Sequence, residues 1–192
     1  MCRRQTKETQ VEVEILLDGS GRADVATGIG ILDHLLEQVA RHGLLDISLR
    51  AQGDLARDEH HLVEDVGIAL GRALHEALGE RTGIVRMAHA LVPMDEALAL
   101  VALDLGGRGH AALEISFGGP RLGGMATELI GHLLRSLASE GRLTLHASLL
   151  AGADDHHRAE AVFKALGRAL GEAVGPEPRL GGQAPSTKGV ID

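Results

Sequence analysis

The chain has 192 residues, of which 44% are hydrophobic, and its formal net charge is −8 at neutral pH. Its apolar mass is almost entirely aliphatic, because there are two phenylalanines and neither tryptophan nor tyrosine. Modules that bind nucleic acid need aromatic side chains to stack on bases and a basic surface for the phosphates, so this composition disfavours that class.

The first ten residues lack the apolar core of a signal peptide. No stretch approaches the roughly 20 apolar residues that span a membrane, and a single cysteine, Cys2, excludes an internal disulfide framework. We therefore expect a cytoplasmic protein that does not bind membranes.

The first half of the chain alternates strand and helix patterns. Alternating polar and apolar residues predict strands, and apolar residues three and four positions apart predict helices, with Gly43 ending the first of these. The predicted elements are strands at 9–17 and 22–27, a helix at 31–41, a strand at 45–51 and a helix at 59–78.

The second half repeats this order. Its predicted elements are strands at 97–105 and 111–117, a Gly/Pro loop at 118–124, a helix at 127–139, a strand at 143–149 and a helix that begins at His156. The repeated unit, strand, strand, helix, strand, helix, indicates an internal duplication in an α/β (α+β, two-layer) protein. We assign residues 1–85 to the first half and 86–192 to the second, within one compact catalytic domain.

A His-His-x-x-Glu motif lies near the start of the second helix of each half. The two copies are His60, His61 and Glu64, and, 96 positions later, His156, His157 and Glu160. Residues four apart share a helix face, so the first histidine and the glutamate can hold one ion together. The second histidine is turned about 100° away and can reach another ion. One copy alone is typical of a solvated helix, whereas two in register indicate a paired metal site.

The first helices of the two halves each contribute one more histidine, His34 and, 98 positions later, His132. Symmetry then predicts two equivalent sites, one with His34, His60, Glu64 and His157 and the other with His132, His156, Glu160 and His61. Three imidazoles and a carboxylate suit manganese, iron, cobalt or zinc. Five histidines have no matched partner and are interpreted as surface or supporting residues: His42, His75, His89, His110 and His146.

Several polar residues outside the repeat are further candidates. Side chains that can clamp a phosphate are Arg86, Arg108, Lys164, Ser186 and Lys188, although each alone is typical of a solvated surface. Candidate acid/base groups are Glu8, Asp95 and Glu96. Nothing in the local sequence distinguishes these three from surface carboxylates. The Pro/Gly-rich segment after Gly175 is compatible either with a disordered tail or with a loop that closes over a ligand.

Long motifs run through the whole chain, among them QTKET, TGIGILDHLLEQVARHG, DEHHLVEDVGIALG, PMDEAL, TELIGHLL, LAGADDHHRAEAVFKALGRAL and PSTKG. With these motifs the chain closely resembles the imidazoleglycerol-phosphate dehydratase family. The resemblance implies dehydration of imidazole glycerol phosphate to imidazole acetol phosphate in histidine biosynthesis. It also implies two Mn²⁺ ions per active site and a homo-oligomer of 24 subunits built from trimers. The implied fold has two four-stranded sheets flanking a helical bundle, of the ribosomal protein S5 domain 2-like type.

The resemblance also assigns roles to residues. The implied metal ligands are the eight residues already selected: His34, His60, His61, Glu64, His132, His156, His157 and Glu160. The implied substrate contacts are Gln38, Arg86, Arg108, Lys164, Ser186 and Lys188, and Glu8 matches a carboxylate placed for proton transfer.

Two other function classes use the same eight ligands. A non-catalytic metal-binding or structural shell protein would fill the coordination sphere of each ion, and a di-metal hydrolase would act on phosphate esters. An assay on imidazole glycerol phosphate separates them from a dehydratase.

Overall fold

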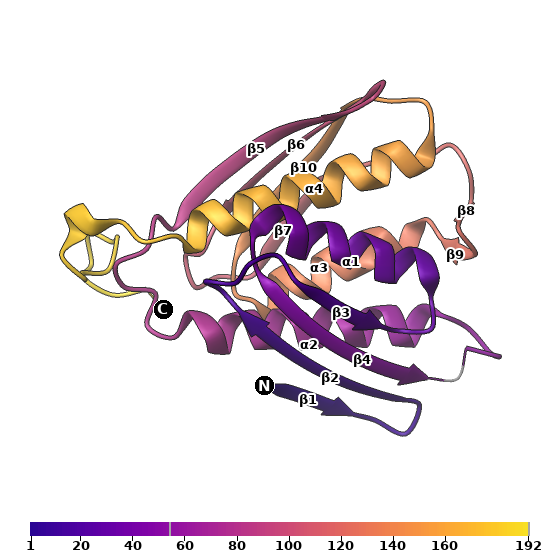
Figure 1. Cartoon of the computed structure of the whole chain (residues 1–192), viewed down its shortest axis with the longest axis horizontal. Coiled ribbons are helices and arrows are strands. Elements are labelled where there is room, and N and C mark those ends of the chain that lie inside the picture. The colour runs from indigo at the N-terminus through magenta and orange to yellow at the C-terminus, as the bar shows by residue number, and fades with distance from the viewer. Residues whose placement is uncertain (54, 192) are drawn as a thin grey trace.

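The computed structural model describes residues 1–53 and 55–191, and its two halves follow the same order of elements (Figure 1). The first half contains β1 (Cys2–Gln5), β2 (Thr9–Leu16), β3 (Ala23–Ala26), α1 (Gly30–Gly43), β4 (Asp46–Gly53) and α2 (His60–Leu78). The second contains β5 (Met87–Met94), β6 (Ala97–Asp104), β7 (His110–Glu114), β8 (Arg121–Leu122), β9 (Met125–Ala126), α3 (Glu128–Glu140), β10 (Thr144–Ala151) and α4 (Asp155–Val174). A short 3-10 helix, η1 (Pro178–Leu180), follows.

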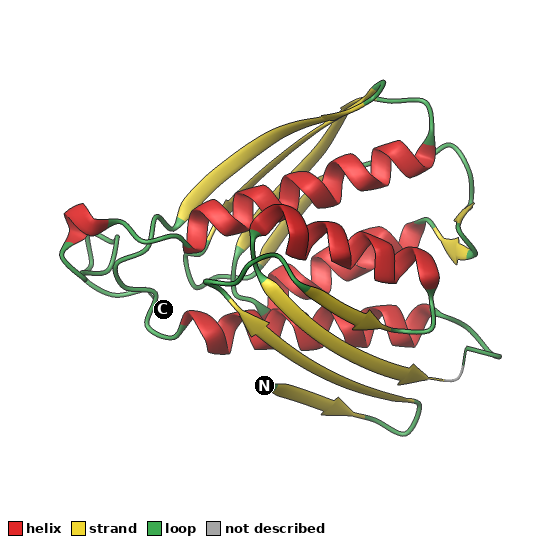
Figure 2. Cartoon of the chain, in the orientation of Figure 1, coloured by secondary structure: helices red, strands yellow, loops and turns green. Residues whose placement is uncertain are grey.

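Each half forms a four-stranded sheet with the same topology. The strand orders are β1-β2-β4-β3 and β5-β6-β10-β7. In each sheet the last strand is parallel to its neighbour and the other pairs are antiparallel. The two sheets lie on the outside and the four helices lie between them (Figure 2). This arrangement confirms the duplication and the two sheets that flank a helical bundle.

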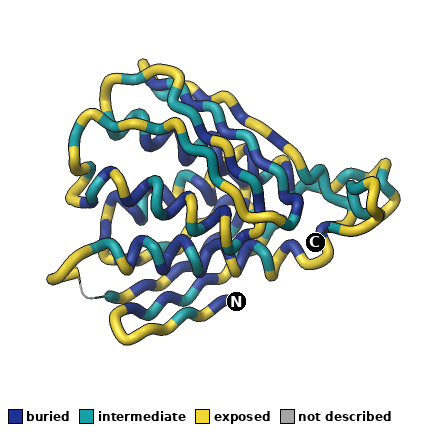
Figure 3. The backbone as a smooth tube through the Cα atoms, turned by 180° about the vertical axis from the view of Figure 1, so that it is seen from behind, coloured by how far each residue is buried: buried dark blue, intermediate teal, exposed yellow. Residues whose placement is uncertain are grey.

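The helices of one half pack on the helices of the other, α1 on α4 and α2 on α3. Glycines allow the close approach. A Cβ added at Gly167 would lie 2.6 Å from the carbonyl oxygen of Val39, and one at Gly71 would lie 2.7 Å from that of Leu137. Gly71 and Gly167 are 96 positions apart, so both helix contacts use the same place in the repeat. Buried residues form one continuous core between the sheets (Figure 3).

Gly43 was expected to occupy the capping position at the end of its helix. It is instead the last helical residue of α1, and Leu44 takes the capping position in the left-handed conformation (φ 54°). In the second half α3 ends at Glu140, Gly141 follows it, and the next residue, Arg142, is left-handed (φ 48°). An added Cβ at Gly43 would lie 2.7 Å from the carbonyl oxygen of Gly167. The glycine is therefore needed for helix packing rather than for the turn.

The predicted repeat unit was wrong in one respect, because each half begins with a further strand. β1 has the sequence CRRQ, in which only Cys2 is buried, so it has no apolar pattern. β5 buries Ala88, Ala90 and Val92 and contains Pro93, which a strand tolerates at a sheet edge. The predicted loop at 118–124 also contains part of a short hairpin, formed by β8 and β9.

The C-terminal segment is folded against the link between the halves. The amide of Glu177 donates to the carbonyl oxygen of Gly83, and the amide of Gly83 donates to that of Gln183, at 2.8 and 2.9 Å. Arg86 Nη1 donates to the carbonyl oxygen of Pro185 at 2.6 Å. This segment therefore lies at the end of the bundle where α2 and α4 finish, shown in yellow in Figure 1. Closure over a ligand stays a prediction.

Candidate metal centre

All four helices begin at the same end of the bundle (Figure 1). His34 and His132 are each the fifth residue of their helix, α1 and α3. The two His-His pairs lie at the first turns of α2 and α4. The duplicated fold therefore places all eight predicted ligands at one end of the molecule.

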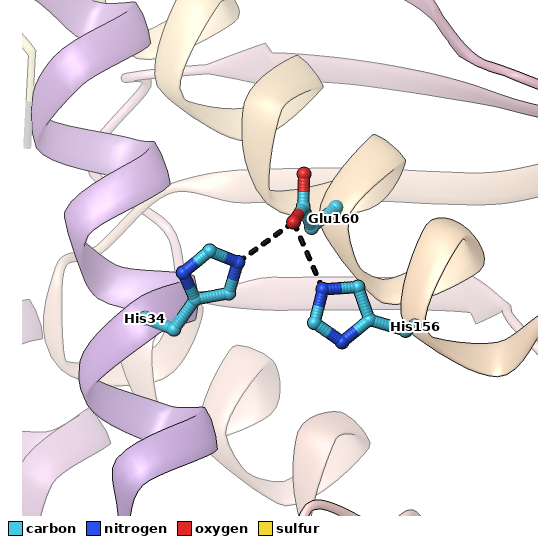
Figure 4. Close-up of side chains that lie close together, drawn as sticks. All are labelled: His34, His156 and Glu160. Atoms are coloured by element: carbon cyan, nitrogen blue, oxygen red, sulfur yellow. Dashed lines mark hydrogen bonds and ion pairs between the residues drawn. The ribbon is translucent and has the colours of Figure 1, made fainter.

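Three of these residues already converge within one chain (Figure 4). His34 Nε2 lies 2.7 Å from Glu160 Oε1, and His156 Nε2 lies 3.0 Å from the same oxygen. The two rings stack with their centroids 5.3 Å apart. One donor atom from each of the three residues lies within 4.8 Å of the other two, which is compatible with a shared ion. Close packing of α1 on α4 produces this triad.

The carboxylate of this triad is buried and ionised. Lys164, one turn further along α4, places Nζ 2.5 Å from Glu160 Oε2. Burial opposes the charge on Glu160, but hydrogen bonds from Lys164, His34 and His156 outweigh burial and lower the pKa of Glu160 to about 2. Lys164 also contacts Met94 Sδ at 3.1 Å. Lys164, a predicted substrate contact, therefore lies beside the metal ligands.

The other triad is less closely assembled. The rings of His60 and His132 have their centroids 4.8 Å apart, and Glu64, half-buried, follows His60 by one helical turn. The position that matches Lys164 in α2 is Ile68, 96 positions earlier. The two centres therefore share ligand types but differ in the neighbouring charge.

The predicted partition of ligands is wrong within one chain. Symmetry placed His34 with His60 and Glu64, but His34 instead contacts His156 and Glu160. His132 in turn lies next to His60. The cause is that α1 packs on α4 and α3 on α2, so each first-helix histidine joins the motif of the other half. Sequence offsets reveal equivalent positions but not which helices meet.

The second histidine of each motif contacts a carboxylate outside the triads. His61 Nδ1 lies 2.9 Å from Glu8 Oε2, and His157 Nδ1 lies 2.8 Å from Glu96 Oε2. The hydrogen bond that His157 donates to Glu96 raises the pKa of His157. Backbone hydrogen bonds from Asp154 and Ala153, with the one from His157, lower the pKa of Glu96 to about 2. All three predicted acid/base groups therefore lie near the metal end, since Asp95 is 3.7 Å from His157 Nε2.

Most predicted phosphate contacts lie at the opposite end. Arg86 donates to Asp104 at 2.7 and 3.0 Å as well as to Pro185. The amide of Lys188 donates to Ser186 Oγ at 3.2 Å, and the Lys188 side chain is exposed. Arg108 is also exposed. Only Gln38, one turn after His34 on α1, shares the metal end with Lys164.

Two buried charged residues escaped sequence reasoning. Asp65, next to the first motif, is 5% exposed and accepts hydrogen bonds from Arg4 Nε at 2.6 Å and from the Thr9 hydroxyl. It thereby anchors the hairpin that carries Glu8. Arg81, 2% exposed, donates to three backbone carbonyl oxygens. An acidic residue inside the apolar face of α2 was the available signal for Asp65, whereas Arg81 lies outside any pattern.

Comparisons with known proteins agree along almost the whole chain. A profile of the family "Imidazoleglycerol-phosphate dehydratase" matches residues 27–170. A relative of that name from Chloroflexus aggregans is 60% identical over 188 residues, covering 98% of this chain and 92% of the relative. Another, from Dehalococcoides mccartyi, is 56% identical over 190 residues, with 99% and 95% covered.

Solved structures give the same result. The crystal structure of IGPD from Pyrococcus furiosus in complex with (S)-C348 matches with a TM-score of 0.84 and 38% identity, covering 98% of this chain and 99% of that one. The imidazoleglycerol-phosphate dehydratase of Staphylococcus aureus matches with a TM-score of 0.81 and 34% identity, covering 91% and 98%. Among the described residues, none of the helices is both long and apolar enough to cross a membrane.

Proposed function

The chain belongs to the imidazoleglycerol-phosphate dehydratase family, and we propose that its reaction depends on two metal ions bound where the four helices begin. It is a hydro-lyase of histidine biosynthesis that converts imidazole glycerol phosphate to imidazole acetol phosphate and water. The observation that carries the metal proposal is the triad of His34, His156 and Glu160, whose donor atoms lie within 4.8 Å of one another.

The donor set fits a divalent transition metal. Imidazole and carboxylate together accommodate Mn²⁺ as well as iron, cobalt or zinc, and we infer two Mn²⁺ ions per site in line with the family resemblance. One ion would be held by His34, His156 and Glu160 and the other by His60, His132 and Glu64. His61 and His157 contact carboxylates outside these triads, and we infer that they serve ions shared with a neighbouring copy. When bound, the cations would supply positive charge that stabilises the deprotonated imidazole of the substrate.

Glu8 is the residue that we assign to proton transfer. The C–H bond that breaks lies next to no carbonyl group and one carbon away from the ring. We infer that the deprotonated ring first expels the hydroxyl group, as water, from the carbon attached to it, after which conjugation with the ring acidifies the C–H bond on the next carbon. A carboxylate beside the metal end can accept this proton, and Glu8 lies there, 2.9 Å from His61 Nδ1. Its side chain is half-exposed, which leaves it accessible to a substrate. Return of a proton to the ring and tautomerisation of the resulting enol then give the ketone product.

We propose that a second copy of the chain binds the phosphate. The amide of Arg86 donates to the carbonyl oxygen of Ala173 in α4, 13 residues after Glu160 and therefore about 20 Å along the helix axis. The substrate has only three carbons between its ring and its phosphate. One molecule therefore cannot reach both Glu160 and the Arg86 end of the same chain. We infer that Arg86, Arg108, Ser186 and Lys188 of one copy serve the metal end of another.

A homo-oligomer, with 24 subunits built from trimers as the resemblance implies, would provide these contacts. Exposed apolar side chains support association. Leu44 is 60% exposed and Leu91 is 56% exposed, and both line a groove of about 720 Å³ at the end of α4. Metal removal should then release smaller particles, because association linked to a ligand is lost with the ligand. Light scattering before and after chelation measures this, and an unchanged large particle would contradict metal-bridged interfaces.

The function is tested by assaying the chelator-treated protein on imidazole glycerol phosphate while Mn²⁺ is added back. We expect the enolisable ketone product to appear in proportion to bound metal. Full activity without metal would contradict the metal proposal. Turnover also separates this reading from a structural metal protein, which would bind Mn²⁺ without forming product. The cytoplasmic location remains a proposal, which cell fractionation can check.

A further inference from the structure

The turn between β5 and β6 is tied to the start of α4. Glu96 Oε1 accepts hydrogen bonds from the amides of Ala153 and Asp154 at 3.0 and 2.8 Å. Its other oxygen, Oε2, lies 2.8 Å from His157 Nδ1. Asp95, the preceding turn residue, has a left-handed backbone (φ 46°). Both oxygens of Glu96 are therefore engaged, one by the backbone and one by an imidazole.

This contact sets the protonation of the His157 ring. An ionised carboxylate only accepts hydrogen bonds, so opposite Glu96 Oε2 the Nδ1 atom of His157 is the donor. Nε2 of a neutral His157 is then left with its lone pair, which is the form that binds a metal ion. A carboxylate that holds the other ring nitrogen of a metal ligand fixes its tautomer and its orientation.

Glu8 occupies the equivalent place in the first half. Glu8 directly precedes β2 and Glu96 directly precedes β6, so the two are 88 positions apart at the same point of the repeat. Glu8 contacts Nδ1 of His61 as Glu96 contacts Nδ1 of His157. The halves differ in one respect: in the part of the chain that the structure describes, no backbone amide is recorded as donating to the Glu8 carboxylate. Both oxygens of Glu96 are therefore engaged, whereas among the described residues only Oε2 of Glu8 has a partner.

We propose that Glu96 is a positioning residue that holds His157 in the metal-binding tautomer, whereas its counterpart Glu8 keeps one unengaged oxygen that can accept a proton. This inference rests on the metal centre proposed above. It removes Glu96 from the candidate bases, because both of its oxygens are occupied. It also explains why the two halves retain a carboxylate at the same position but use it differently.

Glu96→Gln tests the proposal, because it changes one hydrogen bond and little else. The amide oxygen of Gln must take the place of Oε1 to accept the two backbone N–H groups. Its NH₂ group then faces His157 Nδ1, donates to it and places the ring proton on Nε2. We expect the Mn²⁺ affinity of the full-length chelator-treated protein, measured by equilibrium dialysis, to fall about 10–100-fold. The midpoint of thermal unfolding should stay at the parent value.

Two controls separate positioning from a general structural effect. Glu140→Gln alters a carboxylate that pairs with Arg72 near the end of α3, and it should leave Mn²⁺ affinity unchanged. In a His157→Ala background, Glu96→Gln should cause no further loss of affinity, since the residue through which it acts is absent.

The outcomes distinguish this inference from the proposed function. If the parent protein binds no Mn²⁺, the metal centre itself fails. If the parent binds and Glu96→Gln binds equally well, only the positioning role is overturned. An equal loss in the His157→Ala background would also overturn it, as would failure of Glu96→Gln to fold, because Gln retains both backbone contacts.

Discussion

The two histidine-rich centres derive from one repeated unit, yet only one is closely assembled within a single chain. At the α4 centre, His34 and His156 converge on Glu160, and Lys164 binds its second oxygen. At the α2 centre the rings of His60 and His132 approach each other, and Ile68 replaces the lysine. Duplication has preserved the ligands while their supporting residues diverged. Two sites of common origin therefore need not be equivalent.

The largest effect is expected at Glu8, the carboxylate with one unengaged oxygen. Glu8→Gln removes the proposed proton acceptor and should lower kcat about 10²–10⁴-fold, the usual cost of losing a general base. Substrate binding and Mn²⁺ content, measured by calorimetry and metal analysis, should remain near the parent values. Near-normal turnover would show that Glu8 is not the general base, and Asp95 would be the next candidate.

Matched substitutions at the two centres test the ligand assignment. His60→Ala and His156→Ala remove equivalent ligands, and each should weaken Mn²⁺ binding by at least about 100-fold, since even supporting residues cost 10–100-fold. In His156→Ala the buried Glu160 keeps Lys164 as partner, so the fold should persist. Circular dichroism checks folding, and retention of two tightly bound ions in either variant would contradict the ligand assignment.

Phosphate binding should be affected separately from the metal. Lys188→Ala removes an exposed cation at the opposite end of the bundle. We expect KM to rise about 10–100-fold, because a charge-assisted hydrogen bond contributes roughly 1.5–3 kcal/mol. Mn²⁺ content should not change. If steady-state kinetics showed an unaltered KM and kcat, Lys188 would be a solvated surface residue that does not bind the substrate.

Substitutions at two glycines test the close helix contacts, α1 on α4 and α2 on α3, that bring the metal ligands together. Gly167→Ala and Gly71→Ala each force a methyl group against a backbone carbonyl oxygen and should lower the free energy of unfolding by about 1–3 kcal/mol. Gly30→Ala is the control, because its added Cβ would meet no atom within 4 Å. Chemical denaturation measures all three, and equal stability of Gly167→Ala and Gly30→Ala would show that the contact adjusts freely.

The smallest expected effect is a dependence of stability on pH. Burial, with the charges of Arg81 and Arg142, lowers the pKa of His75, and burial with Lys164 and Arg168 lowers that of His42. The unfolded chain therefore binds more protons below about pH 6.5, and stability should fall as the pH decreases through that value. His75→Gln should flatten this dependence in thermal melts, whereas substitution of the exposed His89 should not.

Sequence periodicity predicted most of the fold because the buried helices and central strands carry regular apolar patterns. It missed β1 and β5, since a charged edge strand and an alanine-rich one carry little pattern. The repeat selected all eight ligand candidates, but not the partner of His34, which depends on how α1 packs on α4. The sequence also did not show that Glu8 and Glu96 occupy equivalent positions. The residues around them are dissimilar, and only their places in the two hairpins match.

Complementation between two impaired variants, assayed at a substrate concentration well below the KM of Lys188→Ala, tests most directly whether one active site takes its metal end and its phosphate end from different copies. Glu8→Gln and Lys188→Ala proteins are stripped of metal, mixed, and reassembled with Mn²⁺. We predict dehydratase activity well above the sum of the separately reassembled variants, because some mixed sites combine an intact Glu8 with an intact Lys188. Activity equal to that sum, in particles shown to contain both variants, would contradict a site shared between copies.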